Sequence, residues 1–232
     1  MIMIHGDNKG LVLPPRVAQT QVVLVPIVYK EDDPASINNK LEEIYKQFKE
    51  AGVRTFYDDR DNYNPGWKFN HWEVKGVPIR IELGKKDFEN QEVRVVRRDT
   101  GAKQQMKWDQ LATGIPHLLE EIQGDMYRKA EKERDEHIKE TENWEQFMDC
   151  LNQKNLCLAP WCEDSECEIK AKDRSKEESL KLIEQAGEEE EVLTGAAKTL
   201  CIPFDQTPLK EGAKCFHCGK DAKTKALWGR SY

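Results

Sequence analysis

Between residues 22 and 57 the sequence reads as a strand, a helix and a second strand, and this pattern limits the possible folds most strongly. Residues 22–25 form an uninterrupted apolar run, which is typical of a strand covered on both faces. Apolar side chains then recur at helical spacing until Gly52, a residue that can end a helix. Residues 53–57 are again rich in β-formers. The pattern predicts a βαβ unit with two parallel, neighbouring strands.

The following residues extend this unit into an α/β domain. A proline at the start and a glycine after the end favour a helix over residues 65–75. Residues 78–83 alternate between apolar and polar, which is typical of a strand with one wet face, and residues 93–96 form the next strand. A helix over residues 108–122 completes the domain. We predict a mixed sheet of about five strands with flanking helices.

The second half of the chain shows weaker periodicity. Residues 125–150 are dense in charge, which predicts a solvated connecting helix. Short apolar runs at 156–159 and 200–203 predict strands, and the acidic stretch 177–193 predicts a solvated insertion. A length of 232 residues leaves room for two domains. We expect the second to be a small α+β domain.

Composition excludes several protein classes. The longest apolar run, residues 22–28 with one proline inside it, is far shorter than the roughly 20 residues of a membrane helix. We therefore expect no membrane span. The first residues contain no basic segment followed by a long apolar segment, so we expect no signal peptide either. Lys and Arg total 36 against 43 Asp and Glu, but residues 1–124 carry 18 against 19. An RNA-binding surface is therefore expected to be local and to lie in the first half.

Four of the seven cysteines form two close pairs. An odd number of cysteines without a leader favours a reducing compartment over a disulfide scaffold. Two short loops that each deliver two thiolates suit a closed tetrahedral zinc site. We therefore expect a structural zinc ion, and its ligands would be Cys162, Cys167, Cys215 and Cys218.

Two other interpretations of these thiols stay open. One is that the four are ordinary thiols. The other is that Cys215 and Cys218 form a thiol–disulfide active site; only 14 residues follow Cys218, which argues against it. His217 is expected to point away from the pairs. The remaining cysteines lie in apolar company and are expected in the core: Cys150, Cys157 and Cys201.

A charged cluster and an aromatic-rich helix follow the strand at 53–57. The cluster is DDRD at residues 58–61, and the rings are Trp67, Phe69 and Trp72. Ligand sites of α/β sheets lie at the carboxyl ends of parallel strands, and planar charged groups with aromatic rings suit single-stranded RNA. The structural alternative is that the rings pack the helix on the sheet and the cluster is a buried turn network. Basic residues that could bind phosphates follow nearby: Lys85, Lys86, Arg94, Arg97 and Arg98.

Three stretches resemble one protein family. They are HGDNKGLVLPPRVA at residues 5–18, the segment from DDRD at 58–61 to GVPIR at 76–80, and LWGRSY at 227–232. Together they resemble the C-terminal portion of prolyl-tRNA synthetase of the eukaryotic and archaeal type. The resemblance implies that residues 1–18 are the tail of a class II catalytic domain with its linker. Residues 19–123 would then be the anticodon-binding domain, and 124–232 a zinc-binding-type C-terminal domain.

The family resemblance also implies site residues. Anticodon bases of proline tRNA would be bound by Arg54, Asp61, Pro65 and Lys75. The two cysteine pairs match the metal positions of the family. Tyr232 matches a terminal tyrosine that folds back toward the active site of the parent enzyme, which makes it a supporting residue and not a catalytic one.

The resemblance thus implies the tRNA-recognition part of a cytoplasmic proline–tRNA ligase. The parent would use ATP and Mg and would be a homodimer; a monomer is the expectation for these residues alone. No Walker loop, GxSxG, HExxH or GxGxxG is present, and the ATP and proline motifs are expected upstream, so we expect no ligase activity from this chain by itself. The main alternative is a zinc-stabilised protein-interaction or regulatory module.

Overall fold

A computed structural model describes residues 1–28, 34–186 and 195–231. It divides the chain into two compact units, Met1–Glu131 and Lys132–Tyr232. The domain boundary expected after residue 123 lies inside a continuous helix, α5 (Leu111–Glu136). Among the described residues, no helix combines the length and the apolar character that crossing a bilayer requires.

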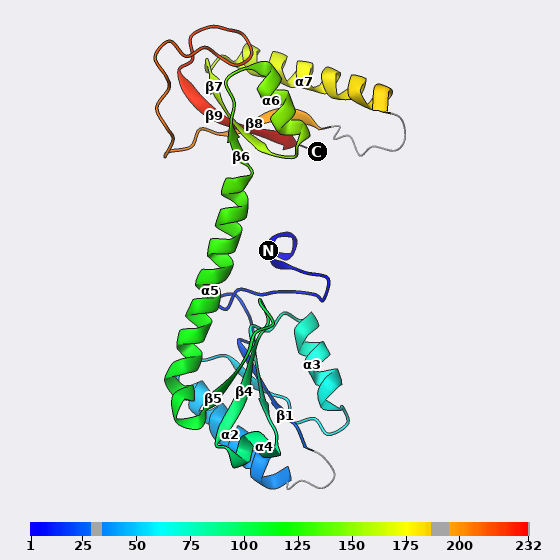
Figure 1. The fold of residues 1–232 in the computed structure, drawn as a ribbon, viewed down its shortest axis with the longest axis vertical. Coiled ribbons are helices and arrows are strands. Elements are labelled where there is room, and N and C mark those ends of the chain that lie inside the picture. The colour runs from blue at the N-terminus through cyan, green and yellow to red at the C-terminus, as the bar shows by residue number, and fades with distance from the viewer. Residues whose placement is uncertain (29–33, 187–194, 232) are drawn as a thin grey trace. The chain divides into compact units, whose positions relative to one another are not determined.

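The first unit contains a five-stranded sheet in the order β2-β1-β3-β4-β5 (Figure 1). Its strands are β1 (Val22–Pro26), β2 (Thr55–Tyr57), β3 (Ile79–Leu83), β4 (Glu92–Arg97) and β5 (Lys103–Lys107). The predicted βαβ unit is confirmed, because β1 pairs in parallel with β2, with Val22 opposite Thr55, through helix α2 (Pro34–Glu50). Strand β3 is parallel to β1, whereas β4 and β5 are antiparallel. Strand β5 was not predicted, because none of its residues is buried.

Helices cover the two faces of this sheet unequally (Figure 1). Helices α2 and α5 bury one face in a large aliphatic core that includes Leu24, Leu41, Phe48 and Ile115. Helix α3 (Pro65–Val74) lies on the opposite face, where Trp72 joins Val23, Val25 and Val77 in a smaller cluster. Short elements complete the unit: α1 (Ile2–His5), α4 (Lys85–Glu89) and a 3-10 turn (Trp108–Gln110).

Two predicted helix boundaries are wrong. Helix α5 passes through Gly124 without a break, although separate helices were expected over 108–122 and 125–150. A glycine inside a helix costs only about 1 kcal/mol, and the apolar spacing of α5 continues to the buried Met126. The helix ends at Glu136 and is followed by strand β6 (Ile138–Glu140) and helix α6 (Trp144–Asn152).

The second unit contains a four-stranded sheet in the order β6-β7-β9-β8. Strands β7 (Leu156–Trp161), β8 (Ala196–Cys201) and β9 (Thr224–Ser231) pair antiparallel, and only β6 is parallel to its neighbour. Helix α7 (Ser165–Ala186) shows that the insertion expected at 177–193 is partly wrong, because residues 177–186 are helical; 187–194 lie outside the described residues. Both units combine mixed sheets with helices, so the predicted fold class is confirmed.

Candidate nucleic-acid interface and metal centre

A buried carboxylate fixes the segment between β2 and α3. Asp58 directly follows β2 and is 0% exposed. Arg60 donates from Nε and Nη2 to its two carboxylate oxygens, each at 2.7 Å, and Trp72 Nε1 donates to Oδ2 at 2.7 Å. Lys68, also buried, donates to the Asp58 carbonyl at 2.9 Å, and its Nζ lies 3.9 Å from Oδ1. The interpretation of the charged cluster as a buried turn network is confirmed for Asp58; Arg60 belongs to the network but is only half-buried.

The charges around Asp58 outweigh its burial. Burial alone would raise the pKa of the carboxyl group, but the hydrogen bonds from Arg60 and Trp72 and the charge of Lys68 lower it below its usual value. Burial lowers the pKa of Lys68. Asp58 therefore stays ionised at neutral pH and ties the loop to the helix, so that the exposed residues between them are held in place.

The three predicted rings of α3 divide into two groups. Trp72 is buried and Phe69 packs against the same cluster, so the packing alternative is confirmed for these two rings. Trp67 is 39% exposed and belongs instead to a surface stack with Tyr63 and His71. Asn64 begins the helix, since its side chain accepts a hydrogen bond from the Trp67 backbone N–H at 2.8 Å.

The four residues expected to bind the anticodon do not lie together: two lie at or before the start of α3, one lies at its other end, and one precedes β2. Asp61 is exposed in the loop after β2, and Pro65 occupies the first turn of the helix. Lys75 caps the other end, with Nζ 5.0 Å from the Trp72 ring centroid. Arg54 precedes β2 and donates from its guanidinium to the carbonyls of Pro15, Arg16 and Ala18. Tyr232 lies outside the described residues.

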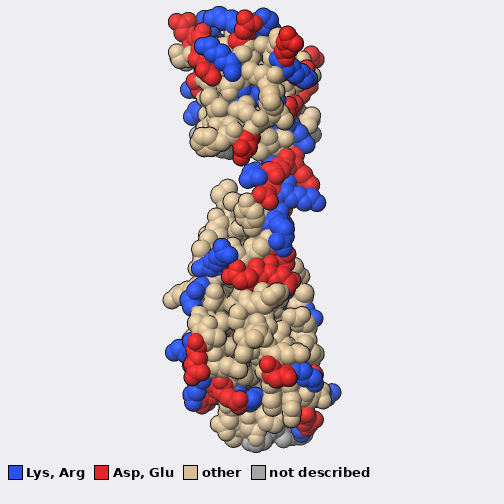
Figure 2. Space-filling view, turned by 90° about the vertical axis from the view of Figure 1, so that its left-hand side faces the viewer, with Lys and Arg blue, Asp and Glu red and all other residues tan. Residues whose placement is uncertain are grey.

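The expected basic stripe does not form a single surface. Arg97 binds Asp99, Glu121 and Asp125, each within 3.0 Å. The hydrogen bonds to Asp99 and Asp125 raise the pKa of Arg97, and the one to Asp99 contributes most. Arg98 faces the other side of β4 and makes a double hydrogen bond to Asp7. The three others, Lys85, Lys86 and Arg94, are exposed. Figure 2 shows acidic and basic side chains interspersed on the face that it displays.

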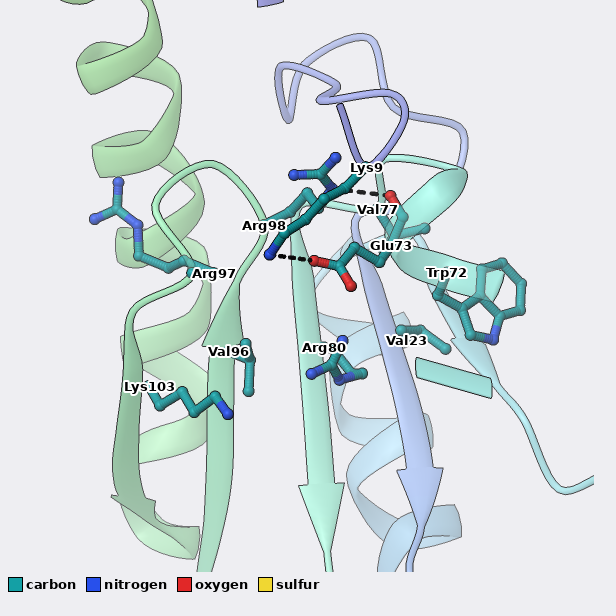
Figure 3. A pocket seen from close by; sticks show the side chains of 11 residues that line it. Lys9, Val23, Trp72, Glu73, Val77, Arg80, Val96, Arg97, Arg98 and Lys103 are labelled. Carbon is teal, nitrogen blue, oxygen red and sulfur yellow. Dashed lines mark hydrogen bonds and ion pairs between the residues drawn. The ribbon is translucent and has the colours of Figure 1, made fainter. Parts of the chain in front are cut away.

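A cavity of about 220 Å³ lies between β3, β4, β5 and the end of α3 (Figure 3). Five cationic side chains and one acidic side chain line it, together with apolar residues. Ion pairs already occupy most of these charges: Lys9 lies 3.3 Å from Glu73, Arg80 binds Glu82, and Arg98 binds Asp7. The cavity is therefore closer to neutral than its basic residues suggest.

The two predicted cysteine pairs meet in the second unit. Cys162 directly follows β7, Cys167 lies in the first turn of α7, and Cys215 and Cys218 lie on one turn before β9. Their four sulfur atoms lie within 4.8 Å of one another. Two of the separations are 3.6 Å, between Cys162 and Cys218, and 3.8 Å, between Cys167 and Cys215. This donor set can hold one metal ion that prefers soft ligands.

The turn around the second pair is shaped for such a cluster. Gly219 has φ +71°, a conformation that disfavours other residues, and its N–H donates to the Cys215 carbonyl at 3.1 Å. The Cys215 N–H in turn donates to the Lys220 carbonyl at 2.7 Å. These bonds orient both sulfur atoms of the pair toward one point.

Two expectations about neighbouring residues are wrong. His217 does not point away from the cluster, because its Nδ1 lies 3.4 Å from Cys167 Sγ. Cys201 is exposed, since β8 is an edge strand of its sheet, whereas Cys150 and Cys157 are buried as expected.

Sequence reasoning missed three residues that shape the loop after β2. Lys68 looks like an ordinary surface lysine of a helix, and only its place opposite Asp58 explains its burial. Tyr63 and His71 lie four residues before and after Trp67, a spacing that could have indicated the stack.

Comparisons with known proteins match the two parts of the chain to two different family models. Residues 21–118 match the family model described as "Anticodon binding domain", and residues 144–232 match "Prolyl-tRNA synthetase, C-terminal". The whole chain is 47% identical to "Proline--tRNA ligase, cytoplasmic" of Arabidopsis thaliana and covers 41% of that protein. It is 44% identical to "Putative proline--tRNA ligase YHR020W" of Saccharomyces cerevisiae over 34% of that protein.

A solved structure agrees. The chain superimposes over its full length on 45% of prolyl-tRNA synthetase from Cryptosporidium parvum, complexed with halofuginone and AMPPNP, with a TM-score of 0.88 and 46% identity. The chain thus spans less than half the length of each of these relatives. It belongs to the prolyl-tRNA synthetase family and corresponds to the C-terminal portion of those enzymes, an anticodon-binding domain followed by the family's C-terminal domain.

Proposed function

We propose that this chain is the part of a proline–tRNA ligase that recognises the anticodon of proline tRNA. The observation that carries the proposal is the loop between β2 and α3, held by the buried Asp58 at the carboxyl end of a parallel strand. That position is where α/β sheets bind ligands. The loop presents exposed polar groups and an aromatic stack, which are the groups that bind unpaired RNA bases.

The four residues carried over from the family would contribute in different ways. Asp61 and Pro65 flank the exposed stack, where a carboxylate can accept hydrogen bonds from base amino groups. Lys75 would contact phosphate or base from the other end of α3. Arg54 is exposed and holds the linker at residues 15–18 against the strand through Nε and Nη2, so Nη1 is the group that would contact RNA.

Proline activation belongs, in this proposal, to the part of the relatives that this chain does not cover. There ATP and Mg would be used, and the parent would be a cytoplasmic homodimer that transfers proline to the tRNA end. The Cryptosporidium structures carry AMPPNP in one case and L-proline with AMP in another. The 232 residues alone would then show no proline-dependent pyrophosphate exchange.

We also propose that the four-cysteine cluster binds a structural zinc ion. With sulfur–zinc distances of about 2.3 Å, a regular tetrahedron separates its sulfur atoms by about 3.8 Å. The measured separations of 3.6 and 3.8 Å fit that geometry. All four ligands come from the protein, which is typical of a structural site. Bound zinc would contribute directly to the folding of the second unit.

Binding of proline tRNA tests the anticodon proposal. The chain is titrated with proline tRNA and with the same tRNA changed at the second and third anticodon bases, at two salt concentrations. We expect the changed tRNA to bind at least about tenfold more weakly, equivalent to about 1.4 kcal/mol, at both salt concentrations. Equal binding of both tRNAs would contradict anticodon recognition by this chain, and binding of neither would favour the protein-interaction alternative.

A further inference from the structure

Three rings form a continuous stack at the loop that Asp58 holds. The centroids of Tyr63 and Trp67 are 3.8 Å apart with an interplanar angle of 12°, and those of Trp67 and His71 are 4.7 Å apart at 16°. Nearly parallel rings at these separations attract one another. The rings recur every four residues: Trp67 and His71 lie one turn apart on α3, and Tyr63 directly precedes its N-cap, Asn64.

The two ends of the stack differ in their ring contacts. Trp67 is exposed at its edge, but Tyr63 covers one of its faces and His71 covers the other. The outer end at His71 meets the edge of Trp72, with the ring centroids 5.1 Å apart. Tyr63 is the last ring at the other end and is half-buried. Within residues 1–28, 34–186 and 195–231, no ring contact is found on its outer face.

Arg60 supports the stack from the side. Its Cζ lies 5.0 Å from the Tyr63 centroid and 5.3 Å from the Trp67 centroid. If the guanidinium lay on the outer face of Tyr63, its distance to Trp67 would exceed its distance to Tyr63 by about the 3.8 Å between the two rings. The two distances are nearly equal, so Arg60 lies beside both rings. Because Arg60 is itself held by the buried Asp58, Tyr63 is fixed before any ligand binds.

We propose that Tyr63 is the stacking platform for one unpaired nucleobase of the RNA loop that this domain binds. A ring that is already ordered loses little conformational entropy on binding, and base–aromatic stacking tolerates any base. Tyr63 therefore supplies affinity, while neighbouring exposed polar groups such as Asp61 and Asn62 supply the choice of base. This inference rests on the proposed anticodon recognition and names the contact through which it gains affinity.

The test uses the full chain and an RNA hairpin with the anticodon loop of proline tRNA. We expect Tyr63→Ala to weaken binding by about 5- to 150-fold, the range for removal of one stacking ring. Tyr63→Phe keeps the ring and should bind within roughly twofold of the original chain, whereas Tyr63→Leu keeps apolar bulk without the ring and should behave like Tyr63→Ala. Phe204→Ala, which removes a fully exposed ring in the second unit, is the matched control and should change nothing.

Two outcomes separate this inference from the proposed function. If Tyr63→Ala binds as tightly as the original chain, while that chain still discriminates anticodon bases, the stacking inference is overturned and the proposed function stands. If the original chain does not discriminate the bases, both fail.

A second measurement needs no variant. Irradiation of the original chain with a hairpin carrying 5-iodouridine in the loop should cross-link the peptide that contains Tyr63, as mass spectrometry would show. Cross-links confined to residues outside the stack would overturn the inference even if Tyr63→Ala failed to fold.

Discussion

The two units of the chain have cores of different chemical composition. The core of the first unit is almost entirely aliphatic, with side chains from β1, β3, β4, α2 and α5 packed on one face of a sheet. The core of the second unit is smaller and consists largely of aromatic rings and cysteines, and it includes three of the four clustered thiols. Regular apolar burial can stabilise the first unit alone, whereas we expect the proposed zinc ion to contribute to the stability of the second.

The largest effect is expected from breaking the cysteine cluster. The double variant Cys162→Ser and Cys218→Ser, or removal of the metal with a chelator, should abolish the thermal transition of the second unit, because a structural zinc ion contributes on the order of 10 kcal/mol to folding. The first unit should keep its transition. Calorimetry with elemental analysis for zinc measures both.

The matched control is Cys201→Ser, which changes an exposed thiol outside the cluster. An unchanged second transition in the double variant, with no metal detected in the original chain, would contradict the zinc proposal.

The converse change should affect the first unit only. Phe48 is completely buried between α2 and the sheet, and Phe48→Ala should cost about 3–5 kcal/mol through lost burial and the cavity left behind. Calorimetry should show the first transition at a lower temperature and the second unchanged. Gln47→Ala, on the exposed side of the same helix, should leave both transitions in place. A joint shift of both transitions would show that the units do not unfold independently.

Asp58→Asn should destabilise the first unit by about 3 kcal/mol, because it leaves the buried Lys68 without its charged partner. Its effect should depend on pH. The folded state lowers the pKa of Asp58, so its stabilising contribution is complete above the ordinary carboxyl pKa of about 3.9 and is lost as the pH falls toward the lowered value.

Urea unfolding of both chains at neutral pH and at pH 3 measures this effect. The difference between the original chain and Asp58→Asn should shrink in acid; a difference that is the same at both pH values would contradict the ion-pair account.

The smallest effect is expected at Gly124, which lies inside α5, the helix that was predicted as two separate helices. A Cβ there would meet only the end of the flexible Arg128 side chain, at 2.9 Å. Gly124→Ala should therefore stabilise the first unit by about 0.5–1 kcal/mol, less any weakening of the Arg128–Asp125 ion pair. Urea unfolding measures the change.

Gly76→Ala is the contrasting variant. Gly76 has φ +72°, and its Cβ would lie 2.6 Å from the Leu11 backbone, so this change should destabilise. If both alanine variants destabilised equally, α5 would not be continuous through Gly124.

Apolar periodicity was enough to predict most of the first unit. The buried run of β1 and the helical spacing of α2 identified the βαβ unit correctly. Strand β5 could not be found in the same way, because its residues form an edge strand with no buried side chain and follow from pairing with β4 alone. The end of α5 was missed for a related reason: its charged last turns carry no apolar signal, and a helix can continue without one.

The two candidate sites also differ in how far the sequence predicted them. The sequence predicted correctly that the four cysteines come together, since two short spacings identify them without any knowledge of the fold. The loop between β2 and α3 was predicted only as a region. Which groups are exposed there depends on Lys68 and Trp72 returning to Asp58 from the next helix, and on Tyr63 covering the ring that the sequence had suggested for stacking.

We propose that the first unit recognises the anticodon bases without the second, because the loop between β2 and α3 lies entirely within the first unit. The most direct measurement is the ratio of dissociation constants for proline tRNA and for the tRNA changed at its second and third anticodon bases, taken with the Cys162→Ser and Cys218→Ser chain. We predict that the ratio stays at about tenfold or more, as in the original chain. A ratio near one, in a chain whose first unit still shows its thermal transition, would contradict the claim.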